Sequence, residues 1–410
     1  MDHFDAVIRS CHIARALALA MLVSAAAPGA AQNAPTLGAA TVALEARLAG
    51  DPAAAVAGEA ATERYAAGLL AAAFPVFEQS RHLDSPYFGR TSGIDGRPGL
   101  SNPDNIYESA LLADDGEYRI HGRRGTHAML TLQILDAYPI VALGRNLAAI
   151  DLDAAGVVPG AEFELRLGGA ARDGLWYALP HGARALLVRQ SFEDWDRETP
   201  SQLHIERLDR TLRVADGAGL GDAVADFVVA VDRLWNANYL PMIRRAPLNT
   251  LPSPRASDIG AGGLGGQQSV MMRYRLAPDQ ALLITVRKSA ARYQGIQLGD
   301  PWFVTPNWIE HQVSLTRAQA ATDADGYMRF VISLRDPGVA NWLDPAGFAE
   351  GFVFMRWQGL PAPLAADEAP TAQLVVLDDM DLHLPLETLR MGAAARAVQL
   401  AQRARAPVRQ

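Results

Sequence analysis

Residues Asp325–Gly359 have the sequence DGYMRFVISLRDPGVANWLDPAGFAEGFVFMRWQG, which carries the clearest secondary-structure signals in the chain. Residues 327–334 alternate polar and apolar side chains and are rich in β-formers, which predicts a strand. Asp336-Pro337-Gly338 is typical of a turn, because proline fixes φ and glycine supplies a positive φ. A second bend is predicted at 341–345, and 351–357 is predicted to return as a strand. We expect this strand–turn–strand unit to organise the fold.

The same alternation recurs on both sides of this stretch. It predicts further strands at 106–113, 117–122, 128–135, 163–167, 176–179, 185–191, 270–276, 281–286, 293–298 and 373–377. Asp114-Asp115-Gly116 separates the first two, and Asp-Gly between alternating runs predicts a hairpin. Helices are predicted at 37–48, 54–79, 201–208, 220–235 and 386–405.

A weak internal repeat is also visible. Four residues recur 164 positions later as the same residue type, namely Ile120, Arg123, Gln133 and Asp136 as Ile284, Arg287, Gln297 and Asp300. A duplicated sheet would produce this pattern, and so would chance.

We therefore expect a mainly β fold with appended α-helices. It would be a β-sandwich, built from two related β halves if the repeat is real, with an N-terminal helical layer and a C-terminal helix. The predicted regions are a signal peptide at 1–31, a helical N-terminal region and linker at 32–100, a first β region at 101–215, a helical and loop connection at 216–266, a second β region at 267–380, and the C-terminal helix at 381–410.

The N-terminus has the features of a bacterial secretory signal. Arg9 and Arg15 precede a short apolar run at 16–27, and Gly29-Ala30-Ala31 supplies a small-residue cleavage site before Gln32. An ordinary amphipathic helix is the alternative. Cleavage would remove Cys11, the single cysteine, so a periplasmic or secreted mature protein would have no disulfide, zinc-thiolate site or cysteine nucleophile.

Composition disfavours two classes of partner. The net charge is −8, with no dominant basic tract, whereas nucleic-acid-binding proteins concentrate Lys and Arg. Beyond the signal, no apolar run approaches the roughly 20 residues of a membrane helix. The sequence leaves the oligomeric state open.

Several blocks resemble a known bacterial family. The stretch DGYMRFVISLRDPGVANWLDPAGFAEGFVFMRW, with PDQALLITVRKSAARYQGIQLGDPW, NPDNIYESALLADDGEYRIHGRRGT and ARALLVRQSFEDWD, is similar to the family catalogued as domain of unknown function 1214. The similarity covers about Ala54 to Gly359. It departs from the pattern at Ala340, where proline is expected, and at Phe348, where histidine is usual. The resemblance implies a β-rich fold with appended helices and no settled activity.

Two groups of residues are candidates for a ligand site. Polar residues before one strand and at the end of another could converge at a sheet edge, although turn formation is an alternative role. The first group comprises Asn102, Asp104, Asn105, Tyr107, Gln133 and Asp136. A guanidinium beside aromatic rings suits a carboxylate, sulfate or ring, although an arginine stacked on a structural aromatic is the alternative. The second group comprises Arg287, Arg292, Tyr293, Gln297, Trp302, Asn307 and His311.

Two further groups have structural interpretations. Five basic candidates, Arg119, His121, Arg123, Arg124 and His127, could hold an anion but more simply form a solvated hairpin tip. In the bend, we expect Asp336 and Asn341 to bond backbone groups, Trp342 to plug the core and Arg356 to pair with Asp344. There is no GxSxG, Walker or GxGxxG motif and no HExxH spacing, so we predict no metal and no cofactor.

The functional expectation is correspondingly coarse. We expect an exported protein that binds, and could transform, a small organic ligand with an anionic or hydroxyl group in a pocket between the β halves. Tyr107, Gln133, Arg292 and Gln297 would line it. The alternatives are a carbohydrate-active hydrolase or lyase on an extracellular glycan, and a non-catalytic envelope interaction protein. Enzymatic activity is left open.

Overall fold

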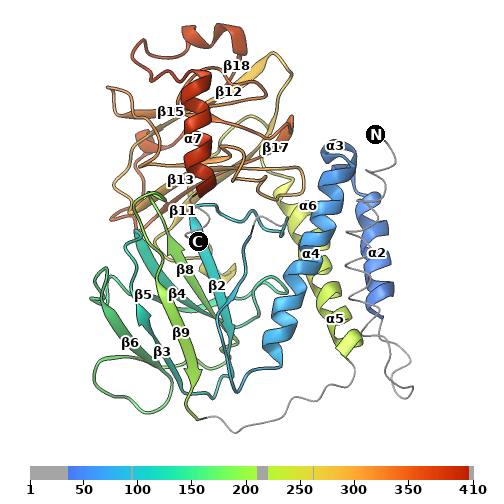
Figure 1. Ribbon diagram of the computed structural model, residues 1–410, viewed down its shortest axis with the longest axis vertical. Helices are drawn as coiled ribbons and strands as arrows, with labels where there is room; N and C mark the ends of the chain where they lie inside the picture. The colour runs from blue at the N-terminus through green and yellow to red at the C-terminus, as the bar shows by residue number, and fades with distance from the viewer. Residues whose placement is uncertain (1–35, 94–95, 210–219, 262, 406–410) are drawn as a thin grey trace.

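The computed structural model describes residues 36–93, 96–209, 220–261 and 263–405. The fold is mainly β, with four sheets, an N-terminal helical region and a C-terminal helix (Figure 1). The expected fold class is therefore confirmed. The predicted signal peptide at 1–31 lies outside the described residues. In the described part of the chain, no helix combines the length and apolar character needed to cross a bilayer.

The first β half is a sandwich of two sheets. One sheet has the order β1-β2-β8-β4-β5 and the other β7-β6-β3-β9. The strands are β1 (Gly89–Arg90), β2 (Asn105–Leu111), β3 (Tyr118–Arg123), β4 (Met129–Leu135), β5 (Asn146–Asp151), β6 (Glu162–Leu167), β7 (Leu175–Tyr177), β8 (Ala185–Ser191) and β9 (Gln202–Arg207). Ile120, Leu132, Leu165 and Val188 belong to the core between these sheets.

The second β half repeats this arrangement. Its sheets have the orders β10-β11-β17-β13-β14 and β16-β15-β12-β18. The strands are β10 (Arg255–Ala256), β11 (Gln268–Arg275), β12 (Gln280–Arg287), β13 (Tyr293–Gly299), β14 (Ser314–Thr316), β15 (Tyr327–Ser333), β16 (Trp342–Leu343), β17 (Glu350–Gln358) and β18 (Thr371–Val376). Its core includes Ile284, Ile296, Phe330 and Val353.

The two halves share one topology, strand for strand. The sheet orders β1-β2-β8-β4-β5 and β10-β11-β17-β13-β14 correspond position by position. The orders β7-β6-β3-β9 and β16-β15-β12-β18 correspond in the same way. Even the parallel pairs correspond, β6 with β7 and β15 with β16. The 164-residue spacing carries Met129–Leu135 onto Tyr293–Gly299, which are the bounds of β4 and β13. Two related β halves are thus present.

Two local predictions are wrong, and in both cases the reason is that strands pair with partners distant in the sequence. β2 and β3 do not form the predicted hairpin, because each pairs within a different sheet of the sandwich. The chain crosses between sheets at the Asp-Gly turn, where Tyr118 Oη accepts a hydrogen bond of 2.8 Å from Ala113 N. β15 and β17 likewise lie in different sheets, so the organising stretch is a crossover. The helix predicted at 201–208 is strand β9, paired along its length with β3.

A helical layer covers one face shared by both halves (Figure 1). It consists of α2 (Leu37–Ala49), α3 (Pro52–Ala57), α4 (Glu59–Ser80), α5 (Leu220–Asp232), a π-helix (Arg233–Tyr239) and α6 (Leu240–Ile243). The predicted 54–79 helix is divided by Gly58, whose φ is +83°. Phe352 of β17 belongs to the same apolar core as Tyr65 of α4, and Leu187 of β8 belongs to the same core as Val76 of α4. The helices therefore bridge the two halves.

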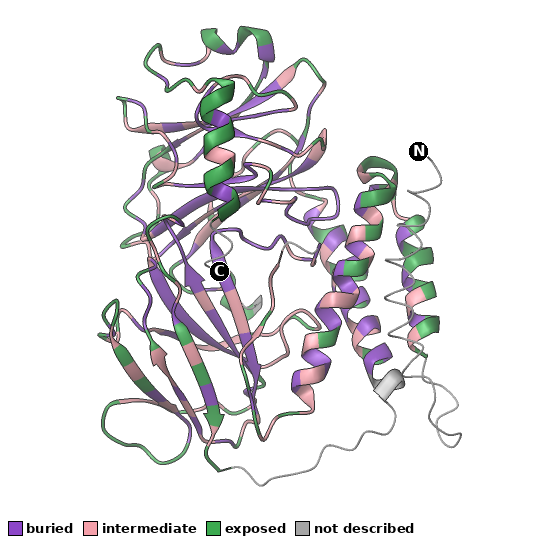
Figure 2. Ribbon diagram, in the orientation of Figure 1, coloured by how far each residue is buried: buried purple, intermediate pink, exposed green. Residues whose placement is uncertain are grey.

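The remaining helices are peripheral. Three short 3-10 segments lie at Ile259–Ala261, Ala366–Glu368 and Leu377–Leu382, and α7 spans Ala393–Arg405. The C-terminal helix begins later than predicted because Leu389 and Met391 are hydrogen-bonded to the backbone of the Gly338–Ala340 bend. In Figure 2 the central strands are purple along their length, whereas the outer strands and α7 carry exposed green residues. The polar side chains buried in this centre define the candidate site.

Candidate functional site

A buried carboxylate connects the two β halves. Tyr293 Oη of β13 donates a hydrogen bond of 2.8 Å to Asp104 Oδ2, and Asn102 Nδ2 donates to the same hydroxyl at 2.9 Å. Asp104 has no solvent exposure. Burial raises the pKa of Asp104 to about 6, against the opposing effects of Tyr293, Arg403 and Arg356. Within the described residues Oδ1 has no hydrogen-bond partner, although the Ser314 hydroxyl is near enough to act on the carboxyl.

Local sequence explains how this contact forms. Asn102 Oδ1 accepts a hydrogen bond of 3.0 Å from Asp104 N, so the turn role considered for this group is correct. Gly295 lies on the same face of β13 as Tyr293, two residues away. A Cβ at Gly295 would lie 2.2 Å from Tyr293 Oη and 3.0 Å from Asp104 Oδ2. Only glycine lets the tyrosine fold over the strand and reach the carboxylate.

The two glutamines of the repeat are both held by protein groups. Gln297 Nε2 lies 3.2 Å from Leu100 O and from Ser101 O and 3.1 Å from Thr305 Oγ1, and its Oε1 accepts from the Arg356 guanidinium. Gln133 Nε2 donates to Gly263 O at 3.3 Å. Neither amide therefore requires a ligand to satisfy its donors, which removes the argument that placed a ligand against them.

Two arginines form the most unusual electrostatic feature of this region. Arg189 of β8 and Arg356 of β17 are both half-buried. The Arg189 guanidinium lies 5.4 Å from the centre of the Tyr107 ring, and that of Arg356 lies 4.1 Å from the centre of the Phe354 ring. Burial lowers the pKa of Arg189, and the positive charge of Arg356 lowers it further. The two guanidinium groups thus repel each other across the junction of the halves.

Arg189 lacks a compensating partner. Its Nε is buried without a hydrogen bond, and in the part of the chain that the structure describes no carboxylate pairs with its guanidinium. Besides Arg356, the ionisable group that affects the pKa of Arg189 is Tyr107, whose hydroxyl accepts a hydrogen bond of 3.0 Å from Asn105 Nδ2. A buried cation normally has an anion beside it, because removing its charge from water is costly. This arrangement can hold an anion supplied from outside.

Half-buried apolar side chains surround the arginines. Met271 is the cross-strand neighbour of Phe354, and both pack against the core beneath the helices. Tyr239 of the π-helix is close enough to Arg356 for that charge to act on its pKa, which burial raises. Phe227 of α5 packs in the same layer. The surroundings therefore suit an organic ligand rather than a fully hydrated ion.

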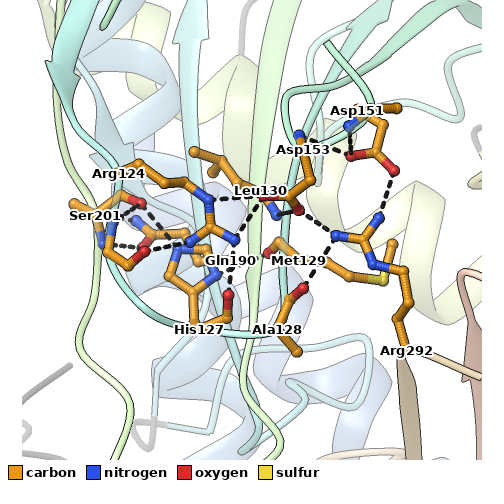
Figure 3. Close-up of polar contacts among 12 residues, drawn as sticks. Arg124, His127, Ala128, Met129, Leu130, Asp151, Asp153, Gln190, Ser201 and Arg292 are labelled. Carbon is orange, nitrogen blue, oxygen red and sulfur yellow. Dashed lines mark hydrogen bonds and ion pairs between the residues drawn. The ribbon is translucent and has the colours of Figure 1, made fainter. Parts of the chain in front are cut away.

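Arg292 does not line this site, contrary to the prediction. Its guanidinium contacts Asp151 at 2.7 Å, also contacts Asp153, and donates to Ala128 O at 3.0 Å (Figure 3). Both aspartates belong to the first half, whereas Arg292 precedes β13 of the second. Arg292 is therefore an ion-pair clamp between the halves.

The other predicted ligand residues are dispersed. Asp136 pairs with Arg145 at 2.6 Å, Arg287 lies 3.6 Å from Asp367, and His311 Nδ1 lies 2.7 Å from Asp344 Oδ2. Trp302 is fully buried and stacks on Tyr65, with ring centroids 4.8 Å apart. Of the predicted ligand residues, the structure brings Asn105 and Tyr107 together beside Arg189, and Tyr293 and Gln297 together near Arg356.

The basic group on β3 divides in two. Arg119 and His121 are partly exposed, and Arg119 pairs with Glu164 and Glu206. Arg124 and His127, by contrast, are buried, so the predicted solvated tip is wrong for them. Within residues 36–93, 96–209, 220–261 and 263–405, no three His, Cys, Asp or Glu side chains are grouped as metal ligands.

One contact resembles a catalytic pair. His127 Nε2 lies 2.9 Å from Ser201 Oγ, while Nδ1 lies 2.8 Å from Met129 O (Figure 3). Burial and the charge of Arg124 lower the pKa of His127 to about 3. Such a histidine is a poor general base at neutral pH, and both side chains are enclosed by protein. We assign this contact a structural role.

Sequence reasoning missed Arg189 and misassigned Arg356. Asp344, the predicted partner of Arg356, instead bonds His311 and Ala346 N. A signal for Arg189 was present, because a charged residue directly follows the apolar run ALLV within the predicted strand 185–191. The rest of the bend follows the prediction: Asn341 bonds the Ala321 backbone and Trp342 is buried.

The chain is similar to a solved structure of an uncharacterized protein from Burkholderia cenocepacia. The two share 28% identity with a TM-score of 0.72, over 83% of this chain and 96% of that one. A protein from Vibrio parahaemolyticus aligns over 82% of this chain and 100% of its own, at 10% identity and a TM-score of 0.44. No family model and no curated protein matches the sequence. The first similarity supports the fold and names no ligand.

Proposed function

We propose that this chain is an exported protein that binds a small organic anion at the junction of its two β halves, beneath the helical layer. The observation that carries the proposal is the Arg189 guanidinium. It is partly withdrawn from water, stacked on Tyr107, repelled by Arg356, and without a carboxylate partner among the described residues. An anionic ligand would relieve the repulsion and supply the missing hydrogen bonds.

The proposal concerns binding alone. The Ser201–His127 contact is enclosed and its histidine is held neutral, so it offers no nucleophile to a ligand. The carbohydrate-active alternative gains no support from the aromatic residues. All seven tryptophans fall in described segments, and each is buried or half-buried, so none forms an open stacking platform. We propose export on the basis of the N-terminal signal features. We likewise propose, from the resemblance of the quoted blocks, that the chain is a member of the family catalogued as domain of unknown function 1214.

A thermal-shift screen tests it. Organic acids are compared with their neutral amides or esters at pH 7.5, because a ligand at 100 times its Kd stabilises the folded state by about 2.7 kcal/mol. Acids should raise the melting temperature and their neutral analogues should not. The rise should disappear in Arg189→Gln and persist in Arg287→Gln, an arginine outside the site whose side chain is 45% exposed. Equal shifts in the two variants would place the binding elsewhere.

A further inference from the structure

We propose that the ligand of this junction is a dianion. This inference rests on the proposed function, since it specifies the ligand of the same site. Three features carry it: the equivalent positions of the two arginines in the duplicated halves, the way each guanidinium is held, and the sum of the charges around them.

The arginines occupy matching places in the two sheets. Arg189 is the cross-strand partner of Thr131 on β4, and Arg356 is the cross-strand partner of Gly295 on β13. Thr131 and Gly295 are separated by the 164 positions of the repeat. Each half therefore contributes one arginine from the same strand pair, and duplication has given the site two cationic groups.

Each guanidinium is also positioned by its own aromatic ring. Each guanidinium lies over an aromatic ring, Tyr107 or Phe354, and a guanidinium held through its plane keeps the N–H donors on its edge for other partners. The edge of a guanidinium matches two oxygens of a carboxylate or phosphate. Arg356 commits one nitrogen to Gln297, whereas Arg189 makes no such bond to the described residues. Donors thus remain on both sides of the junction.

The local charges do not cancel. Arg403 of α7 is buried, its Nε donates a hydrogen bond of 2.7 Å to Trp308 O, and its charge acts on Asp104 together with that of Arg356. Burial lowers the pKa of Arg403 to about 10, so it remains a cation at neutral pH. Two arginines, Arg356 and Arg403, therefore act on one carboxylate, Asp104, and Arg189 adds a third positive charge that acts on Arg356.

A second acid near Asp104 is already neutralised. Glu193 acts on Asp104, but it has its own counter-ion, Arg317, at 3.6 Å. Its two oxygens also accept from Gln294 N and Ala318 N. With this pair set aside, Arg189, Arg356 and Arg403 against Asp104 leave an excess of two positive charges. A dicarboxylate or a phosphate monoester would balance it, and the half-buried apolar side chains around Phe354 would contact the organic body.

Titration calorimetry at pH 8 with matched ligand pairs tests this inference. One pair is phthalate and its monomethyl ester, and the other is phenyl phosphate and methyl phenyl phosphate. In at least one pair the dianion should bind about tenfold or more tightly than the monoanion, which is about 1.4 kcal/mol. The pair that shows the preference identifies the ligand as a dicarboxylate or as a phosphate monoester.

Variants show whether the arginines cause the preference. In Arg189→Gln and in Arg356→Gln the preference for the dianion should fall below about threefold. Arg189→Lys should bind both members of a pair more weakly, because the planar fork of donors is lost, but it should retain the preference, because the charge is kept. Circular dichroism verifies folding, and where one glutamine variant is unfolded the other one decides the matter. Equal binding of mono- and dianions would overturn the inference and leave the proposed function standing. Failure of every anion, including the organic acids of the thermal screen, would overturn both.

Discussion

Ser191 Oγ donates a hydrogen bond of 2.8 Å to Gln358 Oε1, and these residues occupy equivalent ends of β8 and β17. A direct contact between equivalent residues marks the axis that relates the two halves. Arg189 and Arg356 each precede their end residue by two positions, so each shares a strand face with it. The arginine pair is thus arranged around the axis, at the place where the duplicated halves meet.

The unbalanced charge predicts an effect on stability in the absence of ligand. Arg189→Gln should stabilise the free protein, by roughly 1 kcal/mol, because it removes a partly buried cation that another cation repels. Arg292→Gln is the matched control and should destabilise by roughly 1–3 kcal/mol, since it leaves Asp151 and Asp153 without their counter-ion. Urea unfolding measures both. Comparable losses in the two variants would show that Arg189 is an ordinary structural arginine.

Asp104 predicts a pH dependence of a definite sign. Its pKa is raised to about 6 in the folded protein, so its stabilising contribution is present below the unfolded pKa of about 3.9 and is lost as pH rises through 6. Asp104→Asn keeps an acceptor for Tyr293 and cannot ionise. The unfolding free energy of the variant minus that of the parent should rise by up to roughly 3 kcal/mol between pH 4 and 7.

Asp300 and Glu193 also have raised pKa values, of about 6 and about 7. The contribution of Asp300 cancels in this difference. The charge of Asp104 is one cause of the raised pKa of Glu193, so the variant also loses part of that shift, which changes the difference in the same direction. Denaturant titrations at several pH values provide the profile. A difference that stays flat over this range would mean that the carboxyl of Asp104 has an ordinary pKa.

Much of the fold could be predicted because its signals are local. The predicted bounds of β8, 185–191, match the structure, and the spacing between Gln133 and Gln297 pointed to the duplication. Sheet membership could not be predicted in this way. A turn such as Asp115-Gly116 is compatible with a hairpin or with a crossover between sheets. Which of the two forms depends on the distant strands against which the two flanking strands pair and pack.

The candidate site was only partly predictable for a related reason. Asn105 and Tyr107 stood out as polar residues around the start of a predicted strand, Tyr293 as an aromatic residue beside Arg292, and Gln297 as a polar residue in an otherwise apolar strand. Nothing in the sequence separates Arg292 from Arg189 as a candidate. In the structure, Arg292 is neutralised by Asp151 and Asp153, whereas Arg189 has no carboxylate partner among the described residues. Whether an arginine has a counter-ion depends on contacts between segments more than 100 residues apart, such as Asp151 and Arg292, which are 141 positions apart.

The bend at Trp342 provides a stability test separate from the ligand site. The ring is 8% exposed, its Nε1 donates to Ser333 O at 3.0 Å, and the Arg396 guanidinium lies 5.2 Å from its centre. Trp342→Ala should cost about 3–5 kcal/mol of unfolding free energy, as large aromatic truncations do. Anion affinity should remain near the parent value at a temperature where the variant is folded. Parent-like unfolding with lost binding would assign this bend to the ligand site instead.

Export has its own experiment. The basic residues, short apolar run and small-residue site before Gln32 predict cleavage at that position. Intact-mass and N-terminal peptide analysis of protein from the periplasm or medium of a bacterial host should give a mature chain starting close to Gln32. Recovery of full-length protein with Met1 from the cytoplasm alone would refute the proposal of export.

The most direct test of the account locates the anion itself. Crystals of the protein soaked in phenylarsonate, a dianion at pH 8.5 or above, allow arsenic to be found by its anomalous scattering. We predict a peak between Arg189 and Arg356, with arsonate oxygens within hydrogen-bond distance of both guanidinium groups, and no such peak in Arg189→Gln crystals treated in the same way. Arsenic bound only at surface arginines such as Arg287, with the junction empty, would contradict the central claim.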